Sequence, residues 1–552
     1  MGWTAWMIFY LVINLIHGIL TWKLYVRAGK PAWTAFVPIV NMVVLLKIVS
    51  RPVWWVVLLH LPVVNLIMLP VMWIETARSF GHLGTLPTWL TVLTLGVYNG
   101  YIAYGTDSPH RPERSLKPKG GINDLISSLA FAIVAATIVH TYVMQPFIIP
   151  TSSLEKTLLV GDFLFVSKLH YGPRVPTTPL ALPMMHDTIF GTRTKSYIDK
   201  PQLPYTRLPG FSSVKRNDIV VFGWPIDTTT NGLISRNGKP GVRKPLDKKT
   251  NYVKRAVGIP GDVLEIVDGV LMVNGAKSEM PERARLQFSY EGELNSQFSN
   301  QQEVKRIQTI LYERFDITDP ISPVIENGMY SSSKLIMPAL TEEAAATLRE
   351  SGMFKTLEKR IQPAGKLTGR SQGLGMGRAI RTFPETPRHP WNVDNFGPIT
   401  IPAEGVTMPL NPDNAHIYKY LIEVYEGYEI GLNNKLTINN DGVFLNGNAI
   451  DSYTFKQDYY WMMGDNRHNS QDARSWGFVP FSHVIGKPVM VWLSFDINSQ
   501  SKGMFEKARW ERFFTTIDGT GEPVSYRWLV LGLIIAYFVG NYLWARRKER
   551  GA

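Results

Sequence analysis

Apolar residues gather in five long runs, each close to the length that crosses a lipid bilayer. A transmembrane helix needs about 20 consecutive, predominantly apolar residues. Runs of this kind occupy residues 3–22, 53–74, 86–104, 122–144 and 528–544. The pattern therefore predicts five α-helical membrane spans, one of them close to the carboxy terminus.

A sixth apolar run, residues 33–46, is shorter than a span. It contains Pro38 and Asn41 and is followed by Lys47 and Arg51. Irregular backbone at membrane depth is tolerated only where protein or water surrounds it. This run is therefore predicted to be re-entrant or interfacial, and whether it crosses stays open.

Lysine and arginine residues mark the predicted cytoplasmic ends of the spans, because positive residues near span ends face the cytoplasm. They follow the first run at Lys23, Arg27 and Lys30, precede the fourth at Arg111, Arg114, Lys117 and Lys119, and follow the last at Arg546, Arg547, Lys548 and Arg550. With five crossings all three clusters fall on one side of the membrane. Residues 146–525 are then predicted to lie on the other side.

The long region after the fourth run has the pattern of β-strands. Short β-branched and aromatic runs such as DFLFVSKL, DIVVFGWP and VMVWLSFD are bounded by Gly, Asn, Asp or Pro, which is typical of strands. The run VLMVN at residues 270–274, followed by Gly275, resembles one arm of a hairpin. We therefore expect a mostly β domain outside the cytoplasm.

The composition changes between residues 276 and 428, where the chain becomes charged and Gln-rich. The stretch TEEAAATLRES offers Thr341 as a helix cap, with Glu342 and Glu343 in the first turn. Strand-like sequence resumes at KLTINNDGVFLNGNAI. The predicted fold is thus α-helical membrane spans plus a mostly β extracytoplasmic domain that is interrupted by a mixed α/β insertion.

The composition also limits which nucleophiles and metal ligands the chain can use. The 552 residues carry a formal net charge of +13 and no cysteine, which excludes disulfides, thiolate nucleophiles and Cys-ligated zinc. The positive charge fits the basic cytoplasmic loops of a membrane protein, and no base-reading module indicates a nucleic-acid partner. A serine nucleophile needs a base. None of the external histidines lies in a recognisable triad motif, which leaves lysine as the other candidate.

Four segments together resemble one protein family. They are IIPTSSLEKTLLVGDFLFVSK from Ile148, KRNDIVVF from Lys215, NYVKRAVGIPGD from Asn251 and MGDNRHNSQDARSWGFVP from Met463. In this order they resemble the signature boxes of bacterial type I signal peptidases. The resemblance covers residues 122–496 apart from the insertion, and it says little about residues 1–105 or the last span.

The resemblance implies a serine and lysine pair. The family pattern Pro-Ser-x-Ser-Met falls on residues 150–154, so Ser153 is the implied nucleophile and Ser152 is a neighbour without that role. Lys254 falls on the general base, whose pKa must drop from about 10.4 to about 7 through burial. Thr151 falls on the hydroxyl that completes the oxyanion hole of the family, together with the Ser153 N–H.

The third signature implies supporting residues. Ser470 falls on a family serine that hydrogen-bonds the lysine, and Asp472 and Arg474 fall on a supporting pair. Leu154 replaces the usual Met, which affects local packing more than mechanism. His468 stands where an acidic residue is common, and it is given no role.

The function implied by the resemblance is that of signal peptidase I, a membrane-anchored serine endopeptidase. Such an enzyme removes signal peptides from exported pre-proteins after small residues, commonly Ala-x-Ala, without a cofactor or metal. Positions that line its shallow apolar substrate pockets fall on Phe147, Ile149, Pro150, Tyr252 and Val253. The implied partners are signal peptides and membrane lipid, and a contact with the export machinery stays open. The implied location is the bacterial inner membrane, with the catalytic domain on the periplasmic side.

The expected domain plan follows the chain from end to end. It comprises a multi-span membrane domain (1–105), a basic cytoplasmic linker (106–121), a transmembrane anchor (122–145), a first part of the catalytic β domain (146–275), the insertion (276–428), a second β part (429–500), a segment that is either interfacial or an ordinary amphipathic helix (501–525), and a final helix with a basic tail (526–552).

Two other classes remain as alternatives. An aspartic signal peptidase or a metalloprotease would need catalytic carboxylates in the spans or an H-E-x-x-H motif, and neither is found. A non-catalytic membrane scaffold or transporter-associated protein would carry the β domain as an inactive remnant. The complete serine and lysine boxes argue against that reading.

Overall fold

The computed structural model describes residues 2–116, 121–192, 194–227, 243–365, 382–384, 386–498 and 503–550. The chain divides into two compact units. The first consists of Met1–Val143, Pro173–Leu208 and Lys244–Lys249. The second consists of Met144–Gly172, Pro209–Arg243 and Thr250–Ala552.

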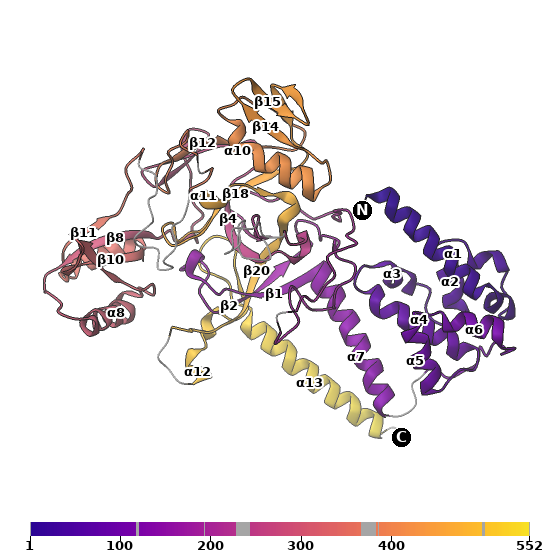
Figure 1. Cartoon of the computed structure of the whole chain (residues 1–552). Helices are drawn as coiled ribbons and strands as arrows, with labels where there is room; N and C mark the ends of the chain where they lie inside the picture. The colour runs from indigo at the N-terminus through magenta and orange to yellow at the C-terminus, as the bar shows by residue number, and fades with distance from the viewer. Residues whose placement is uncertain are drawn as a thin grey trace. The chain divides into compact units, whose positions relative to one another are not determined.

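The first unit is built mainly from helices. Figure 1 shows α1 to α6 grouped together. Buried apolar side chains such as Leu24, Leu46, Met72 and Ile102 form its interior. The helical elements are α1 (Trp3–Arg27), η1 (Ala32–Ala35), α2 (Val40–Ile48), α3 (Trp55–His60), α4 (Asn65–Ser79), α5 (Thr85–Leu93), α6 (Tyr98–Gly105), α7 (Gly121–Ile138) and the π-helical turn η2 (Val139–Val143).

Three helices in the described part of the chain are long and apolar enough to cross a membrane. They are Trp3–Arg27, Asp124–Val143 and Arg527–Arg547, the last within α13 (Arg527–Arg550). They correspond to the first, fourth and fifth predicted spans. The second and third predicted spans are each divided between two shorter helices, and the number of crossings stays a prediction.

The second run is interrupted in its middle. It forms α3 and α4, which are separated at Leu61 to Val64. Pro62 disfavours helical dihedrals at the residue before it, and Leu61 is accordingly extended, with ψ of 121°. Val63 then takes a left-handed φ of 69°. The run therefore forms two helices instead of one.

The third run is also interrupted, at the end of α5. After α5, Leu95 and Gly96 have φ values of 51° and 86°, and the Gly96 N–H donates to the Thr91 carbonyl at 2.9 Å. This is the glycine-terminated helix end that left-handed residues favour. Residues 33–46 likewise form η1 and α2 with a break at Ile39, φ 66°, which agrees with the expectation that they do not form a span.

The second unit is built on an antiparallel sheet, in the order β1-β2-β20-β3-β4-β18-β19 with β21 beside β20. Alternate residues of β3 face two apolar clusters: Val220 and Phe222 one, Ile219 and Val221 the other, as a two-residue period requires. The strands are β1 (Met144–Ile148), β2 (Asp162–Ser167), β3 (Ile219–Gly223), β4 (Asn251–Gly258), β18 (Tyr459–Met463), β19 (Val479–Pro480), β20 (Val484–Ser494) and β21 (Thr515–Thr516). The prediction of a mostly β domain is confirmed.

A second sheet has the order β12-β5-β6-β7. Asn274 and Gly275, with φ of 53° and 79°, turn β6 into β7, which is the two-residue turn that suits a hairpin. The predicted hairpin is thus confirmed. The strands are β5 (Val263–Val267), β6 (Val270–Val273), β7 (Ala276–Lys277) and β12 (Phe396–Thr400).

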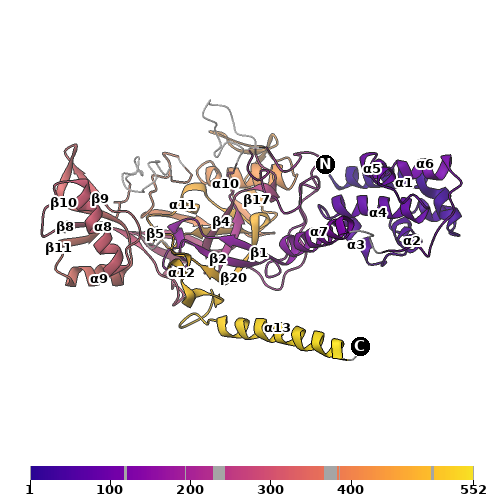
Figure 2. The same ribbon diagram turned by 90° about the horizontal axis from the view of Figure 1, so that it is seen from below.

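The mixed α/β part of the insertion is a four-stranded sheet in the order β11-β8-β10-β9. Figure 2 shows α8 and α9 beside this sheet, and Leu311 and Leu348 from the two helices share its apolar core. Thr341 Oγ1 accepts the Ala344 N–H at 3.1 Å, which confirms the predicted helix cap. The elements are β8 (Phe288–Leu294), α8 (Gln301–Phe315), β9 (Ser322–Glu326), β10 (Met329–Leu340), α9 (Glu342–Glu350) and β11 (Phe354–Lys359).

Shorter elements complete the second unit. They are η3 (Ser152–Leu154), β13 (Thr407–Pro409), α10 (Ala415–Tyr420), η5 (Leu421–Glu429), β14 (Leu436–Asn439), β15 (Gly442–Leu445), β16 (Asn448–Ile450), β17 (Ser452–Thr454), α11 (Ala473–Trp476), η6 (Phe481–His483), α12 (Met504–Lys507) and η7 (Trp510–Arg512). Strand β12 pairs with β5, so the chain rejoins the β5–β6 hairpin before residue 428. The domain boundaries proposed from the sequence stay a proposal.

Candidate active site

The implied nucleophile and base lie in contact. Ser153 is in η3, the short turn that follows β1, and Lys254 is on β4. Lys254 Nζ donates a hydrogen bond to Ser153 Oγ at 2.6 Å. Because β4 lies between β3 and β18 in the sheet, its backbone is held on both sides. The fold thus brings together two residues that are 101 positions apart.

Burial lowers the pKa of Lys254, which favours the neutral amine that a general base requires. The residue is 3% exposed, and burial lowers the pKa of its ammonium from 10.5 to about 8, although Asp472 and Asp465 act in the opposite direction. Its Nζ also donates to the Val253 carbonyl at 3.1 Å and lies 5.6 Å from the centroid of the Tyr252 ring. A fall of this size corresponds to about 3 kcal/mol in favour of the neutral amine.

The two adjacent serines have different partners. Ser152 Oγ accepts a hydrogen bond from Asn469 Nδ2 at 3.1 Å, and its carbonyl accepts one from Asn466 Nδ2 at 3.2 Å. The Asn466 N–H donates to the Ser153 carbonyl at 3.1 Å. Ser152 is therefore bound to the third signature, whereas the Ser153 hydroxyl faces Lys254.

Two donors beside Ser153 are available for a developing negative charge. Thr151 is exposed, has an extended backbone (φ −136°, ψ 153°) and makes no capping hydrogen bond with its side chain. The Ser153 N–H donates no hydrogen bond to any described residue. Free donors at fixed positions are what an oxyanion hole requires.

Buried ion pairs hold the third signature in place. Arg255 donates to both Asp465 oxygens, from Nε at 2.8 Å and Nη2 at 2.6 Å. Arg474 donates to both Asp472 oxygens, from Nε at 2.9 Å and Nη2 at 2.8 Å, and Asp472 also accepts the Gly464 N–H at 3.1 Å. Bidentate pairs of this kind fix geometry as well as charge. The sequence suggested the pair Asp472 and Arg474 but not Arg255 with Asp465.

Ser470 does not make the hydrogen bond that the resemblance implies. Its Oγ is buried and has no hydrogen-bond partner in the described part of the chain. It lies close to the α-carbon of Gly464, since an added Cβ there would come within 2.2 Å of it. The Lys254 amine instead donates to Ser153 Oγ and the Val253 carbonyl, which corrects this expectation.

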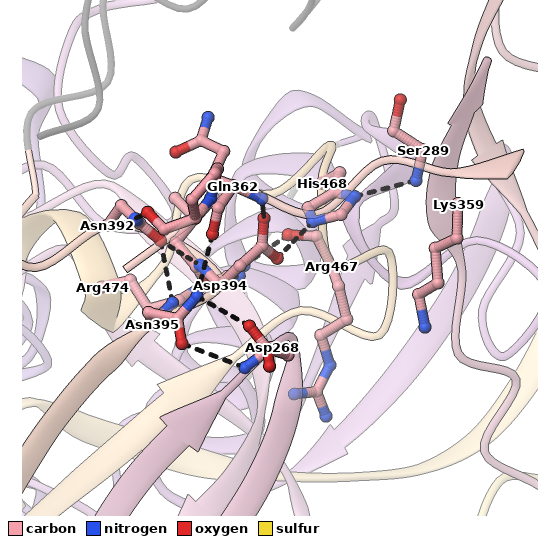
Figure 3. Close-up of polar contacts among 12 residues, drawn as sticks. Asp268, Ser289, Lys359, Gln362, Asn392, Asp394, Asn395, Arg467, His468 and Arg474 are labelled. Carbon is pink, nitrogen blue, oxygen red and sulfur yellow. Dashed lines mark hydrogen bonds and ion pairs between the residues drawn. The ribbon is translucent and has the colours of Figure 1, made fainter. Parts of the chain in front are cut away.

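His468, to which the sequence assigned no role, joins the signature to the insertion (Figure 3). Its Nδ1 accepts the Ser289 N–H at 2.8 Å, and its Nε2 contacts Asp394 Oδ1 at 2.6 Å. Since Nδ1 accepts, Nε2 carries the proton and donates. Asp394 also accepts the Gln362 N–H at 2.9 Å. These partners are 74 or more positions away, so no local pattern signalled them.

Asp319 is a second contribution from the insertion. Its Oδ2 accepts from Asn466 Nδ2 at 2.9 Å and from Asn469 Nδ2 at 3.1 Å. These are the two asparagines that bind Ser152. The insertion therefore orients residues beside the serine pair, although nothing in its composition indicated this.

The residues implied to contact substrate are divided between two apolar clusters. Phe147, Ile149 and Val253 pack in the cluster below η3. Tyr252 belongs to the other cluster, where its ring stacks on Trp224 at 5.5 Å. Pro150 is exposed. Among the described residues no group of three or more His, Cys, Asp or Glu side chains could hold a metal ion.

Comparisons with known proteins match the same part of the chain. The profile of the family described as signal peptidase, peptidase S26, matches residues 122–322 and 424–493. A family of unknown function (DUF5684) matches residues 33–110. The S26 match thus contains η3, β4 and the third signature.

Two curated relatives named signal peptidase I illustrate the extent of the likeness. The one from Rickettsia prowazekii is 28% identical over 159 residues, which cover 28% of this chain and 44% of the relative. The one from Buchnera aphidicola (subsp. Schizaphis graminum) is 23% identical over 371 residues, 67% of this chain and 75% of the relative. The match thus spans less than half of the first relative and three quarters of the second.

The antiparallel sheet and the S26 match define the class of S26 signal-peptidase-like proteins. Within that class, the chain belongs to the type I signal peptidase family. Its long apolar helices make it a membrane-associated member.

Proposed function

We propose that this protein is a membrane-anchored endopeptidase that removes signal peptides from exported pre-proteins, with Ser153 as nucleophile and Lys254 as general base. The observation that carries the proposal is the 2.6 Å contact between Lys254 Nζ and Ser153 Oγ. It is supported by the burial that lowers the pKa of Lys254 to about 8. A base whose pKa is close to the working pH is effective in proton transfer.

The proposed reaction has two halves. Neutral Lys254 takes the proton of Ser153, whose Oγ attacks the peptide carbonyl carbon, and the oxyanion accepts hydrogen bonds from the Thr151 hydroxyl and the Ser153 N–H. When the carbon–nitrogen bond breaks, the Lys254 ammonium returns that proton to the leaving amine. Water then transfers a proton to Lys254 and attacks the ester, and Ser153 Oγ recovers the proton as the new carboxyl group departs.

The proposed substrate is an extended segment that ends in small residues, of the Ala-x-Ala type. Phe147, Ile149 and Val253 are proposed to line the apolar contacts on one side, with Pro150 and Tyr252 beside them. The apolar part of a signal peptide lies in the bilayer, so anchoring the peptidase in the same membrane raises the effective concentration of the cleavage site.

The proposed location is the bacterial inner membrane, with the β domain on the periplasmic side. The side of residues 146–525 is the same whether the second and third runs both cross the membrane or both do not, because two crossings leave the parity of the plan unchanged. The basic residues Arg51, Arg78 and Arg114 gather around Glu75. Positive residues that meet at one end of a helical unit support a cytoplasmic face there.

Proteolysis of sealed vesicles tests this orientation. Protease added to right-side-out vesicles is expected to cut residues 146–525, whereas inside-out vesicles are expected to protect them. The basic end of α13, from Arg546 to Arg550, provides the internal control, because it should be cut only in inside-out vesicles. Cleavage of the β domain in inside-out vesicles alone would contradict the proposed orientation.

The activity itself is tested with the purified full chain and a pre-protein that carries an Ala-x-Ala site. Because only the neutral amine accepts the serine proton, kcat/KM is expected to rise about tenfold per pH unit below the Lys254 pKa, which lies at about 8, and to level off above it. Rates are measured from pH 6 to 10. A rate that does not change over this range would exclude Lys254 as the base, and no cleavage at any pH would favour the scaffold alternative.

A further inference from the structure

A cluster of three arginines and one glutamate lies in the helical unit, outside the proposed active site. Glu75, on α4, contacts Arg51 at 3.0 Å, Arg78 at 3.3 Å and Arg114 at 2.6 Å. The arginines come from the segment before α3, from α4 and from the segment after α6. The cluster therefore joins three separate parts of the membrane domain.

The charges in this cluster do not balance. Among the described residues, Glu75 is the only carboxylate within ion-pair distance of these arginines, so the group carries two excess positive charges. The Glu75 and Arg114 side chains are 5% and 7% exposed. Uncompensated charge in such surroundings is costly unless an anion pairs with it.

One guanidinium nitrogen also lacks a hydrogen bond. Arg114 donates from Nε to Ser79 Oγ at 3.0 Å and from Nη2 to the Val49 carbonyl at 3.3 Å. Its Nη1 is buried and has no partner in the described part of the chain. Buried donors are nearly always satisfied, so this nitrogen indicates an acceptor that the described residues do not supply.

The cluster is both held in place and accessible. Arg114 is fixed by Ser79 and Val49, and Arg51 donates from Nη2 to the Leu116 carbonyl at 3.3 Å. The side chains of Arg51 and Arg78 are 22% and 27% exposed. A ligand can therefore approach the two outer arginines without unfolding the helices around Arg114.

We propose that Arg51, Arg78 and Arg114 form a binding site for an anionic phosphate group. Guanidinium groups present paired N–H donors that match the oxygens of a phosphate, and a single negative group here would offset part of the excess charge. A lipid headgroup and a free phosphate share this chemistry. Basic pockets between helices at the cytoplasmic face suit anionic headgroups. The site does not depend on the proposed peptidase activity.

Calorimetric titration of the full chain in nonionic detergent tests the proposal. The probes are dihexanoyl-phosphatidylglycerol, inorganic phosphate and, as a zwitterionic control, dihexanoyl-phosphatidylcholine. The double variant Arg51→Gln/Arg78→Gln is expected to bind the anionic probe at least about tenfold more weakly, as loss of two charge-assisted contacts requires. Lys47→Gln removes one exposed positive charge nearby and is expected to bind as the unchanged protein does.

The outcomes distinguish a lipid headgroup from a free phosphate as the ligand, and both from the absence of an anion site. Binding of phosphatidylglycerol but not phosphate identifies a lipid site, and binding of phosphate alone identifies a soluble anion; both support the proposal. It is overturned if the unchanged protein binds neither, binds phosphatidylcholine equally well, or loses no affinity in the double variant. Size-exclusion profiles establish folding, and Arg78→Gln, the change at the most exposed arginine, replaces the double variant if that one does not fold.

Discussion

Ser153→Ala is expected to lower the rate of pre-protein cleavage by roughly 10⁴-fold or more, the effect seen when a peptidase loses its nucleophile. The serine hydroxyl is the group that contacts Lys254 Nζ, at 2.6 Å, and no other hydroxyl is bonded to that amine among the described residues. Alanine removes the attacking oxygen and little volume. Single-turnover cleavage of an Ala-x-Ala pre-protein measures the loss.

The matched control is Ser152→Ala, one position away. It removes the hydrogen bond from Asn469 Nδ2 to Ser152 Oγ and leaves the contact between Lys254 and Ser153 in place. We expect a cost of about 1 kcal/mol in stability and retained cleavage. Activity kept in Ser153→Ala but lost in Ser152→Ala would move the nucleophile to Ser152.

Lys254→Met is expected to produce a loss as large as that of Ser153→Ala, because no other base contacts the Ser153 hydroxyl among the described residues. Methionine keeps the length of the side chain and its apolar contacts but cannot accept a proton. The double variant Ser153→Ala/Lys254→Met should be no slower than either single variant, since residues that act as a unit do not add. Substantial cleavage by Lys254→Met would remove Lys254 from the mechanism.

The same substitution should not unfold the protein. The pKa of Lys254 in the folded chain, about 8, is lower than its ordinary value of 10.5, so below pH 8 the folded state must carry a buried ammonium. That cost is fully present below pH 8 and declines as the pH rises to 10.5. Lys254→Met is therefore expected to raise the midpoint of thermal unfolding at pH 7, with a smaller gain at pH 10. A lower midpoint at both pH values would contradict the burial argument.

Local patterns predicted several elements correctly. The hairpin at Asn274 and Gly275 and the cap at Thr341 depend on residues close together in the chain, and both formed as expected. The interruption of the second and third apolar runs also had local signals, Pro62 and Gly96, which a count of apolar length does not use. Hydropathy averages over a window, whereas a single proline or glycine ends a helix.

Contacts between distant segments were less accessible to sequence reasoning. The family motifs indicated Ser153 and Lys254, but the hydrogen bond assigned to Ser470 is absent from the described residues, where the Ser470 hydroxyl lies close to Gly464. The contacts from Asp319 to Asn466 and from His468 to Asp394 cross the insertion. No spacing rule relates such positions, since their distance depends on how the insertion packs on the signature loop.

The amino-acid sequence alone indicated the alternation of strands and the apolar runs, because both follow from residue type and short-range order, and the resemblance of its motifs to a known family implied the candidate serine and its lysine. Only the folded arrangement gave the two serines different partners, Lys254 Nζ for the Ser153 hydroxyl and Asn469 Nδ2 for the Ser152 hydroxyl. Only that arrangement lowered the pKa of Lys254 and left three arginines around one carboxylate. Burial and charge balance depend on which distant groups become neighbours, and that is decided by tertiary packing.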